Sequence, residues 1–95
     1  MKTTQLRRYE LEPEKVSAFI AWFEQEMPAL RRLFEFEIEF YMATDNSEFI
    51  WAVSIAGDKS KFLANEQEYL QSTARAEAFK TFPDGILEKH ISFVL

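Results

Sequence analysis

The amino-acid sequence predicts an α+β fold of the ferredoxin-like class, in which helices cover one face of a four-stranded antiparallel sheet. Three patterns lead to this prediction. Apolar and polar residues alternate strictly at 34–42, apolar residues recur at helix spacing at 13–27, and a β-branched and aromatic segment follows a turn at 49–56. The 95 residues are expected to form a single domain, since a chain of this length fits one hydrophobic core.

The expected elements follow one another as strand, helix, strand, strand, helix and strand. They are a strand at 4–11, a helix at 13–27 that one or two turns extend toward 34, strands at 34–42 and 49–56, helical segments at 59–71 and 73–82, and a strand at 86–95. This order is typical of the split βαβ motif. Right-handed crossovers then favour the strand order 4-1-3-2 with both helices on one face.

The helices are predicted from one apolar stripe and from their end residues. Pro13 suits a first helical turn, where its missing N–H leaves no hydrogen bond unmade. The stripe that follows consists of Val16, Phe19, Ile20, Phe23 and Met27. Pro28 is expected to kink or break this helix. Asp58 and Ser72 are favourable N-cap residues for the two later helical segments.

Residues 34–56 are predicted to form a β-hairpin. Asp45, Asn46 and Ser47 supply turn chemistry between two strand-like segments. A turn centred on Asn46 and Ser47 would pair Met42 with Trp51, Phe40 with Val53, and Glu39 with Ser54.

The alternation assigns the sheet side chains to two faces. The face under the helices should hold Phe36, Ile38, Phe40, Met42, Trp51, Val53, Ile55, Ile91 and Phe93. The other face should hold Glu37, Glu39, Tyr41, Ile50, Ala52, Ser54, His90, Ser92 and Val94. Ile50, Ala52 and Val94 are unusual on a face bathed in water, so at least partial cover is expected there. On the first strand, patterning favours Tyr9 and Leu11 toward the core, because the opposite orientation would bury two charges.

Composition and charge exclude several kinds of partner. The net charge is −5 with scattered Lys and Arg, so neither nucleic acid nor an anionic membrane is expected. There is no long apolar run and no signal peptide, and the cytoplasm is the expected location. Two Gly, one His and no Cys exclude a glycine-rich phosphate loop and a structural zinc site, so no cofactor or metal is expected.

Two segments resemble NIPSNAP-type domains. Residues 5–13, QLRRYELEP, are similar to the family's opening strand and its Pro-led helix, and residues 48–72 are similar to its second half. The match is carried by Leu6, Arg7, Tyr9, Pro13, Trp51, Tyr69 and Ser72. Gln5 and Glu14 depart from the family, which often has an acidic residue and a Gly there. The resemblance implies a dimeric α/β barrel, in which two subunits join their open sheet faces around a pocket.

In such a barrel, the resemblance brings Glu37 and Glu39 of one subunit near His90 and Ser92 of the other. Tyr41 and Ser54 would also line this pocket as ligand-binding residues. His90 is the only side chain that titrates near neutral pH when unperturbed, so it would act as a general base oriented by a carboxylate. The ordinary alternatives are a glutamate stripe that keeps an edge strand soluble and a structural histidine.

Arg7 and Tyr9 match the motif of the family and would bind an anionic or phenolic group, although patterning favours a structural role for them. Three functions follow from these assignments. The chain is a homodimeric barrel that binds a small, partly apolar molecule, a cofactor-independent monooxygenase-like or isomerase-like enzyme, or a structural dimerisation module. The fold alone does not choose among them.

Overall fold

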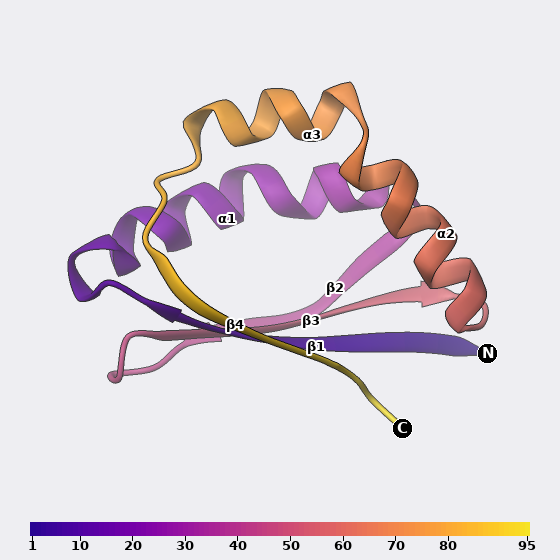
Figure 1. Cartoon of the computed structure of the whole chain (residues 1–95), viewed down its shortest axis with the longest axis horizontal. Coiled ribbons are helices and arrows are strands. Elements are labelled where there is room, and N and C mark those ends of the chain that lie inside the picture. The colour runs from indigo at the N-terminus through magenta and orange to yellow at the C-terminus, as the bar shows by residue number, and fades with distance from the viewer.

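The structure, a computed structural model, describes residues 1–95 and shows a twisted sheet with its helices on one side (Figure 1). The elements are β1 (Lys2–Leu11), α1 (Val16–Arg32), β2 (Phe36–Ala43), β3 (Glu48–Ala56), α2 (Lys59–Leu70), α3 (Thr73–Ala78) and β4 (Ile86–Phe93), with short 3₁₀ segments at Pro13–Lys15 and Phe79–Thr81. The strand order is β2-β3-β1-β4 and every neighbouring pair is antiparallel. The predicted ferredoxin-like fold and its sheet order are confirmed.

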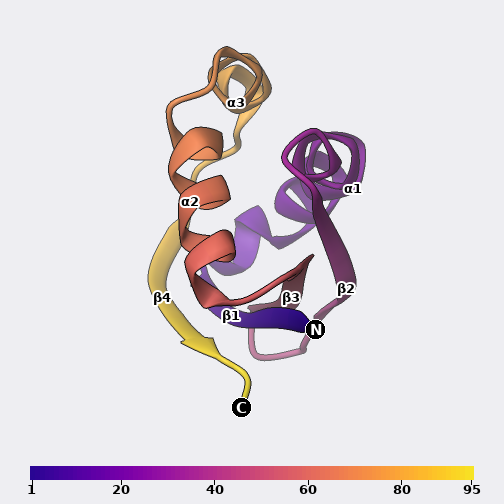
Figure 2. The same cartoon turned by 90° about the vertical axis from the view of Figure 1, so that its right-hand side faces the viewer.

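All three helices lie on one side of the sheet, called the helix layer here, with α3 farther from the sheet than α1 and α2, and the end view shows that none of them covers the opposite face (Figure 2). Asp58 caps α2 by accepting from the Lys61 backbone N–H, and Ser72 caps α3 by accepting from that of Arg75, as predicted. No helix in the structure is both long and apolar enough to cross a membrane.

The core lies between the helix layer and the sheet and is mostly aromatic. Its buried side chains include Tyr9, Phe19, Trp22, Phe23, Phe36, Phe49, Trp51, Phe62 and Tyr69. The ring centroids of Phe19 and Phe23 lie 4.9 and 4.7 Å from that of Phe49, at edge-on and tilted angles respectively, which aromatic pairs favour. Tyr9 and Leu11 are only 5% and 2% exposed, which confirms the predicted orientation of β1.

The expected break at Pro28 is wrong, because α1 runs as one helix from Val16 to Arg32 with Pro28 inside it. An internal proline costs about 3 kcal/mol through a lost hydrogen bond and a steric clash. Met27 and Leu30 on either side are buried in the core, and this packing offsets the cost. The added turn carries Arg31 into the interior.

The predicted hairpin register is wrong from the turn onward, because Met42 pairs with Ile50 rather than Trp51, and a β-bulge in β2 then shifts the pairing again. The pairing with β3 shifts between Ile38 and Phe40, so Glu39 is an extra residue without a direct partner. Beyond the bulge, Phe40 pairs with Ala52 and Met42 pairs with Ile50 on the face without helices. A one-residue shift moves every later side chain to the opposite face.

Three predicted orientations are therefore wrong. Phe40 and Met42 are 42% and 50% exposed rather than part of the core. Tyr41 lies on the helix side, with its ring centroid 5.2 Å from that of Phe23. Ile91, also expected in the core, is 47% exposed because β4 is an edge strand that the helices only partly cover.

Candidate functional site

A cavity of about 320 Å³ lies between the helix layer and the sheet. Its apolar wall consists of Tyr9, Phe19, Trp22, Phe23, Met27, Trp51, Tyr69, Leu70, Phe79, Phe82 and Ile86, and its polar wall of Arg7, Arg31, Glu66, Arg75 and Lys89. Strands β1, β3 and β4 supply one side, and the helices with the second 3₁₀ segment supply the other. Such a mostly apolar space with a few polar groups is the usual form of a small-molecule site.

The polar wall of the cavity contains a triad, defined here as Arg7, Glu66 and Arg31, in which Arg31 is buried and the other two are largely buried. Arg7 Nη2 donates to Glu66 Oε2 at 2.7 Å, and Arg31 Nη1 donates to Glu66 Oε1 at 2.5 Å. Arg7 is further held through Nε by Gln5 Oε1 at 2.7 Å and through Nη1 by the Tyr9 hydroxyl at 3.1 Å. Two buried guanidinium groups therefore share a single carboxylate.

The other cations of the cavity have no carboxylate partner. The Arg75 guanidinium lies over the Phe79 ring, 4.1 Å from its centroid, and the Lys89 ammonium lies 5.7 Å from the Tyr9 ring centroid. Aromatic faces stabilise both charges without neutralising them. Burial raises the pKa of the Tyr69 hydroxyl, against the opposing effect of the nearby arginines.

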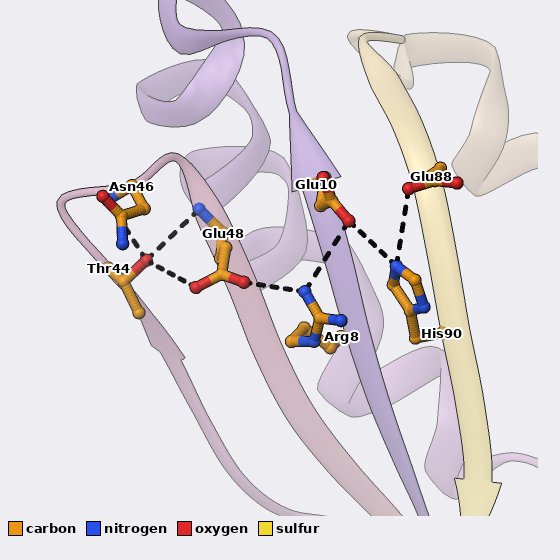
Figure 3. A network of polar contacts seen from close by, with 7 residues as sticks. All are labelled: Arg8, Glu10, Thr44, Asn46, Glu48, Glu88 and His90. Carbon is orange, nitrogen blue, oxygen red and sulfur yellow. Dashed lines mark hydrogen bonds and ion pairs between the residues drawn. The ribbon is translucent and has the colours of Figure 1, made fainter.

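A second polar cluster, the open-face network, lies on the sheet face without helices and is drawn in Figure 3. Arg8 Nη1 lies 2.7 Å from Glu48 Oε2 and 3.7 Å from Glu10 Oε2. His90 Nε2 lies 2.9 Å from Glu10 Oε2 and 3.6 Å from Glu88 Oε2. The hydrogen bond with His90 is the main reason why the pKa of Glu10 is below its usual value.

Glu10, Glu88 and His90 bring one nitrogen and two carboxylate oxygens within 4.8 Å of one another, a spacing that could hold a metal ion. Their side chains are 41%, 66% and 43% exposed, and the Arg8 guanidinium lies beside Glu10. A positive neighbour repels a bound cation. The hydrogen bond between His90 and Glu10 and the ion pairs of Arg8 account for the contacts of this network.

The three predicted catalytic residues do not meet within one chain. Glu39 accepts hydrogen bonds from Ser54 Oγ at 2.5 Å and Lys2 Nζ at 3.1 Å, and the Ser54 bond is the main cause of its lowered pKa. The Glu37 carboxylate lies 3.7 Å from Arg32 Nε. His90 lies on β4, at the opposite edge of the sheet from β2. Their approach across two subunits stays a prediction.

The predicted ligand-binding residues are divided between the two sheet faces. Arg7 and Tyr9 line the cavity. Ser54 lies on the open face with Glu39, and Ser92 pairs with Leu6 in the β1–β4 ladder. Tyr41 is turned away from both sites and donates a 2.6 Å hydrogen bond to Glu24, which raises the pKa of this tyrosine.

Four charged residues of the cavity, Arg31, Glu66, Arg75 and Lys89, were not among the predicted site residues. The sequence does contain a signal for two of them. Arg31 follows Met27 by four residues, and Glu66 lies four residues after Phe62. Both therefore occupy the buried stripe of a helix, where a charge needs a partner.

The fold defines the class of the chain, which is that of the ferredoxin-like α+β domains. A NIPSNAP-like domain protein from Burkholderia xenovorans is similar with a TM-score of 0.83 and 18% identity, over 99% of this chain and 84% of that one. A NIPSNAP family protein from Agrobacterium tumefaciens gives 0.85 and 13%, over 100% and 92%.

The same fold occurs in a candidate antibiotic biosynthesis monooxygenase from Nitrosomonas europaea, with a TM-score of 0.71 and 10% identity over 98% of this chain and 88% of that one. Comparison of the sequence with protein-family models and with curated proteins gives no significant match. The structural likenesses confirm the predicted NIPSNAP-like fold, and at these identities they concern the fold alone.

Proposed function

We propose that this chain binds a small, partly apolar molecule in the cavity between its helices and its sheet. The observation that carries the proposal is the cavity itself, whose volume of about 320 Å³ falls at the lower end of the range of ligand pockets. The interior of a small domain is normally filled to crystal-like density, so a space of this size needs an occupant or solvent. Polar groups beside the apolar wall would orient such a ligand.

The test is a cavity-filling substitution with a matched control. Leu70 and Leu63 both lie on α2 and are 49% and 51% exposed, but only Leu70 lines the cavity. Titration with the neutral aromatic probe 2-naphthamide, followed by ¹⁵N–¹H NMR, should shift cavity resonances in the wild-type protein and in Leu63→Trp. Leu70→Trp should abolish these shifts. An absence of saturable binding of this probe and of its carboxylate 2-naphthoate to the wild-type protein would overturn the proposal.

We also propose that two copies associate through the open sheet face. Phe40 and Met42, paired with Ala52 and Ile50, expose apolar surface on this face, and Val94 is exposed after the end of β4. The resemblance to NIPSNAP-type domains also implies a dimeric barrel. Sedimentation should therefore give a dimer for the wild-type protein and a monomer for Phe40→Lys. Leu63→Lys, on the helix layer, is the control that should stay dimeric. A monomeric wild-type protein would contradict this pairing.

The enzyme alternative depends on that dimer, because only a second copy would bring Glu37 or Glu39 to His90. The shared fold with a candidate monooxygenase favours testing it. In one chain His90 is already bonded to Glu10, so its role as a base requires this contact to exchange. Turnover that His90→Gln abolishes would support this alternative. Turnover that survives the substitution would exclude His90 as the base.

A further inference from the structure

We infer, resting on the proposed cavity site, that the ligand is an organic anion with an aromatic body, such as an aromatic carboxylate. This inference names the chemical class of the ligand. It follows from three independent properties of the cavity wall, namely its net charge, the kind of polar atom left without a partner, and its aromatic lining.

The charge of the cavity is opposite to that of the chain. Four cationic side chains line it, Arg7, Arg31, Arg75 and Lys89, against the single carboxylate of Glu66. The wall therefore carries an excess of three positive charges within a protein whose net charge is −5. In a partly buried space such an excess raises the local concentration of anions and repels cations.

The polar atoms without partners are all hydrogen-bond donors. Three buried side-chain atoms make no hydrogen bond, Arg31 Nε, Trp51 Nε1 and Arg75 Nε, and all three residues line the cavity. Arg31 and Trp51 are each only 1% exposed. An unpaired buried donor costs about 1–3 kcal/mol. These atoms are not accessible to water, so a small movement of their side chains would have to present them to a ligand's acceptor oxygens, and the new hydrogen bonds would recover that free energy.

The second tryptophan of the chain provides an internal comparison. Trp22 also lines the cavity, but its Nε1 donates to the backbone oxygen of Ala78 at 3.0 Å. Its hydrogen-bonding capacity is therefore filled by the fold, whereas that of Trp51 is not. A ligand with acceptor oxygens is expected to engage Trp51 and leave Trp22 bonded to Ala78.

The cations are held ready for an anion by the rings around them. The Arg31 guanidinium lies 4.0 Å from the Tyr69 ring centroid, and that of Arg75 lies 4.1 Å from the Phe79 ring centroid. Eight aromatic side chains line the space, so an aromatic body would find edge and face contacts on several sides. An inorganic anion such as phosphate would satisfy the donors but leave the apolar wall unfilled.

The experiment compares 2-naphthoate with 2-naphthamide, which has the same ring system and no charge, and with inorganic phosphate. Calorimetric titration should give an affinity for 2-naphthoate about tenfold or more above that for 2-naphthamide, because charge-assisted hydrogen bonds are the stronger ones. In ¹⁵N–¹H spectra, 2-naphthoate should shift the Trp51 indole resonance, assigned with Trp51→Phe, more than that of Trp22. Phosphate should not compete with 2-naphthoate at equal concentration.

Arg75→Gln removes one cation that makes no ion pair, so it should fold normally. It should weaken 2-naphthoate binding about tenfold and change 2-naphthamide binding less than twofold. The matched control is Arg32→Gln, an exposed α1 position outside the cavity, which should change neither. Equal binding of both probes, unaltered by Arg75→Gln, would overturn the anion inference alone. Binding of neither probe would overturn the proposed cavity site.

Discussion

Arg7 and Arg8 are neighbours on β1, and they point to opposite faces of the sheet with opposite arrangements of charge. On the helix-covered face, Arg7 and Arg31 share the single carboxylate of Glu66. On the open face, the carboxylates of Glu48 and Glu10 share the single guanidinium of Arg8. One strand therefore separates a positively charged interior from a negatively charged surface.

The two clusters differ in burial as well as in sign. The side chains of Arg7, Glu66 and Arg31 are 13%, 12% and 2% exposed, whereas those of Arg8, Glu10 and Glu48 are 39%, 41% and 24% exposed. Water screens the open-face charges, so each of them can change its ion-pair partner at little cost in free energy. The charges of the triad are largely shielded from water, so each of them depends on its ion-pair partner or on a bound ligand for compensation.

The largest effect is expected from Glu66→Gln, which leaves the two buried guanidinium groups without a counter-charge. Breaking a buried ion pair by removing one partner typically costs about 3–5 kcal/mol. We expect the free energy of unfolding, measured by urea denaturation, to fall by about that amount. Because an anion would replace the lost charge, 2-naphthoate should stabilise this variant more than it stabilises the wild-type protein.

A double-mutant cycle tests the physical reason for this loss. Adding Arg31→Met to Glu66→Gln removes one of the stranded charges, so the double variant should be more stable than Glu66→Gln alone. If the two substitutions simply add, or if Glu66→Gln costs less than about 1 kcal/mol, the triad is not a buried charge cluster.

The contrast between the two faces was only partly predictable from the sequence. Alternation and helix spacing indicate which segments are strands and helices, and the crossover rule then gives the sheet order. Arg7 and Tyr9 entered the predicted site through a family motif. Arg31 and Glu66 lie 35 positions apart, and nothing local in the sequence joins them. Their pairing is a property of the packed helices.

The bulge at Glu39 is the other feature that alternation could not show. The segment from Phe34 to Met42 alternates without interruption, so a regular strand was the natural prediction. The extra residue becomes visible only when β2 is paired with β3, where Tyr41 packs against Phe23 beneath α1. The register after the bulge, with Tyr41 on the helix side, places Phe40 and Met42 on the open face.

An intermediate effect is expected from Glu48→Gln on the open face. Arg8 keeps Glu10 as a second carboxylate, and exposed ion pairs are worth at most about 1 kcal/mol. Urea denaturation of the monomeric Phe40→Lys background should therefore show a loss of about 1 kcal/mol or less. A loss as large as that of Glu66→Gln would remove the distinction between the two faces.

A smaller effect, visible mainly in acid, is expected from Glu39→Gln. The hydrogen bond from Ser54 holds the pKa of Glu39 below the ordinary value of 4.5. Since the pKa is lower in the folded state, the carboxylate contributes stability above the unfolded value, and this contribution is lost as the pH falls through the folded value. The free energy of unfolding of the Glu39→Gln variant should therefore fall less than that of the wild-type protein as the pH is lowered from 5 through the folded-state pKa of Glu39. Parallel curves for the two proteins would contradict this.

The smallest effect is expected from Glu37→Gln, two residues along the same strand. Its carboxylate lies 3.7 Å from Arg32 Nε, with side chains 64% and 61% exposed, so in a monomer the substitution should change stability by less than about 0.5 kcal/mol. The midpoint of thermal denaturation is measured over a hundredfold range of protein concentration, because this distinguishes a contact within one chain from a contact between two subunits. If Glu37 approaches His90 of the partner subunit, the substitution will lower the midpoint appreciably only at concentrations where the dimer forms, because only then does the carboxylate have a partner besides Arg32 to lose. A loss that is independent of concentration would instead place the contact of Glu37 within one chain.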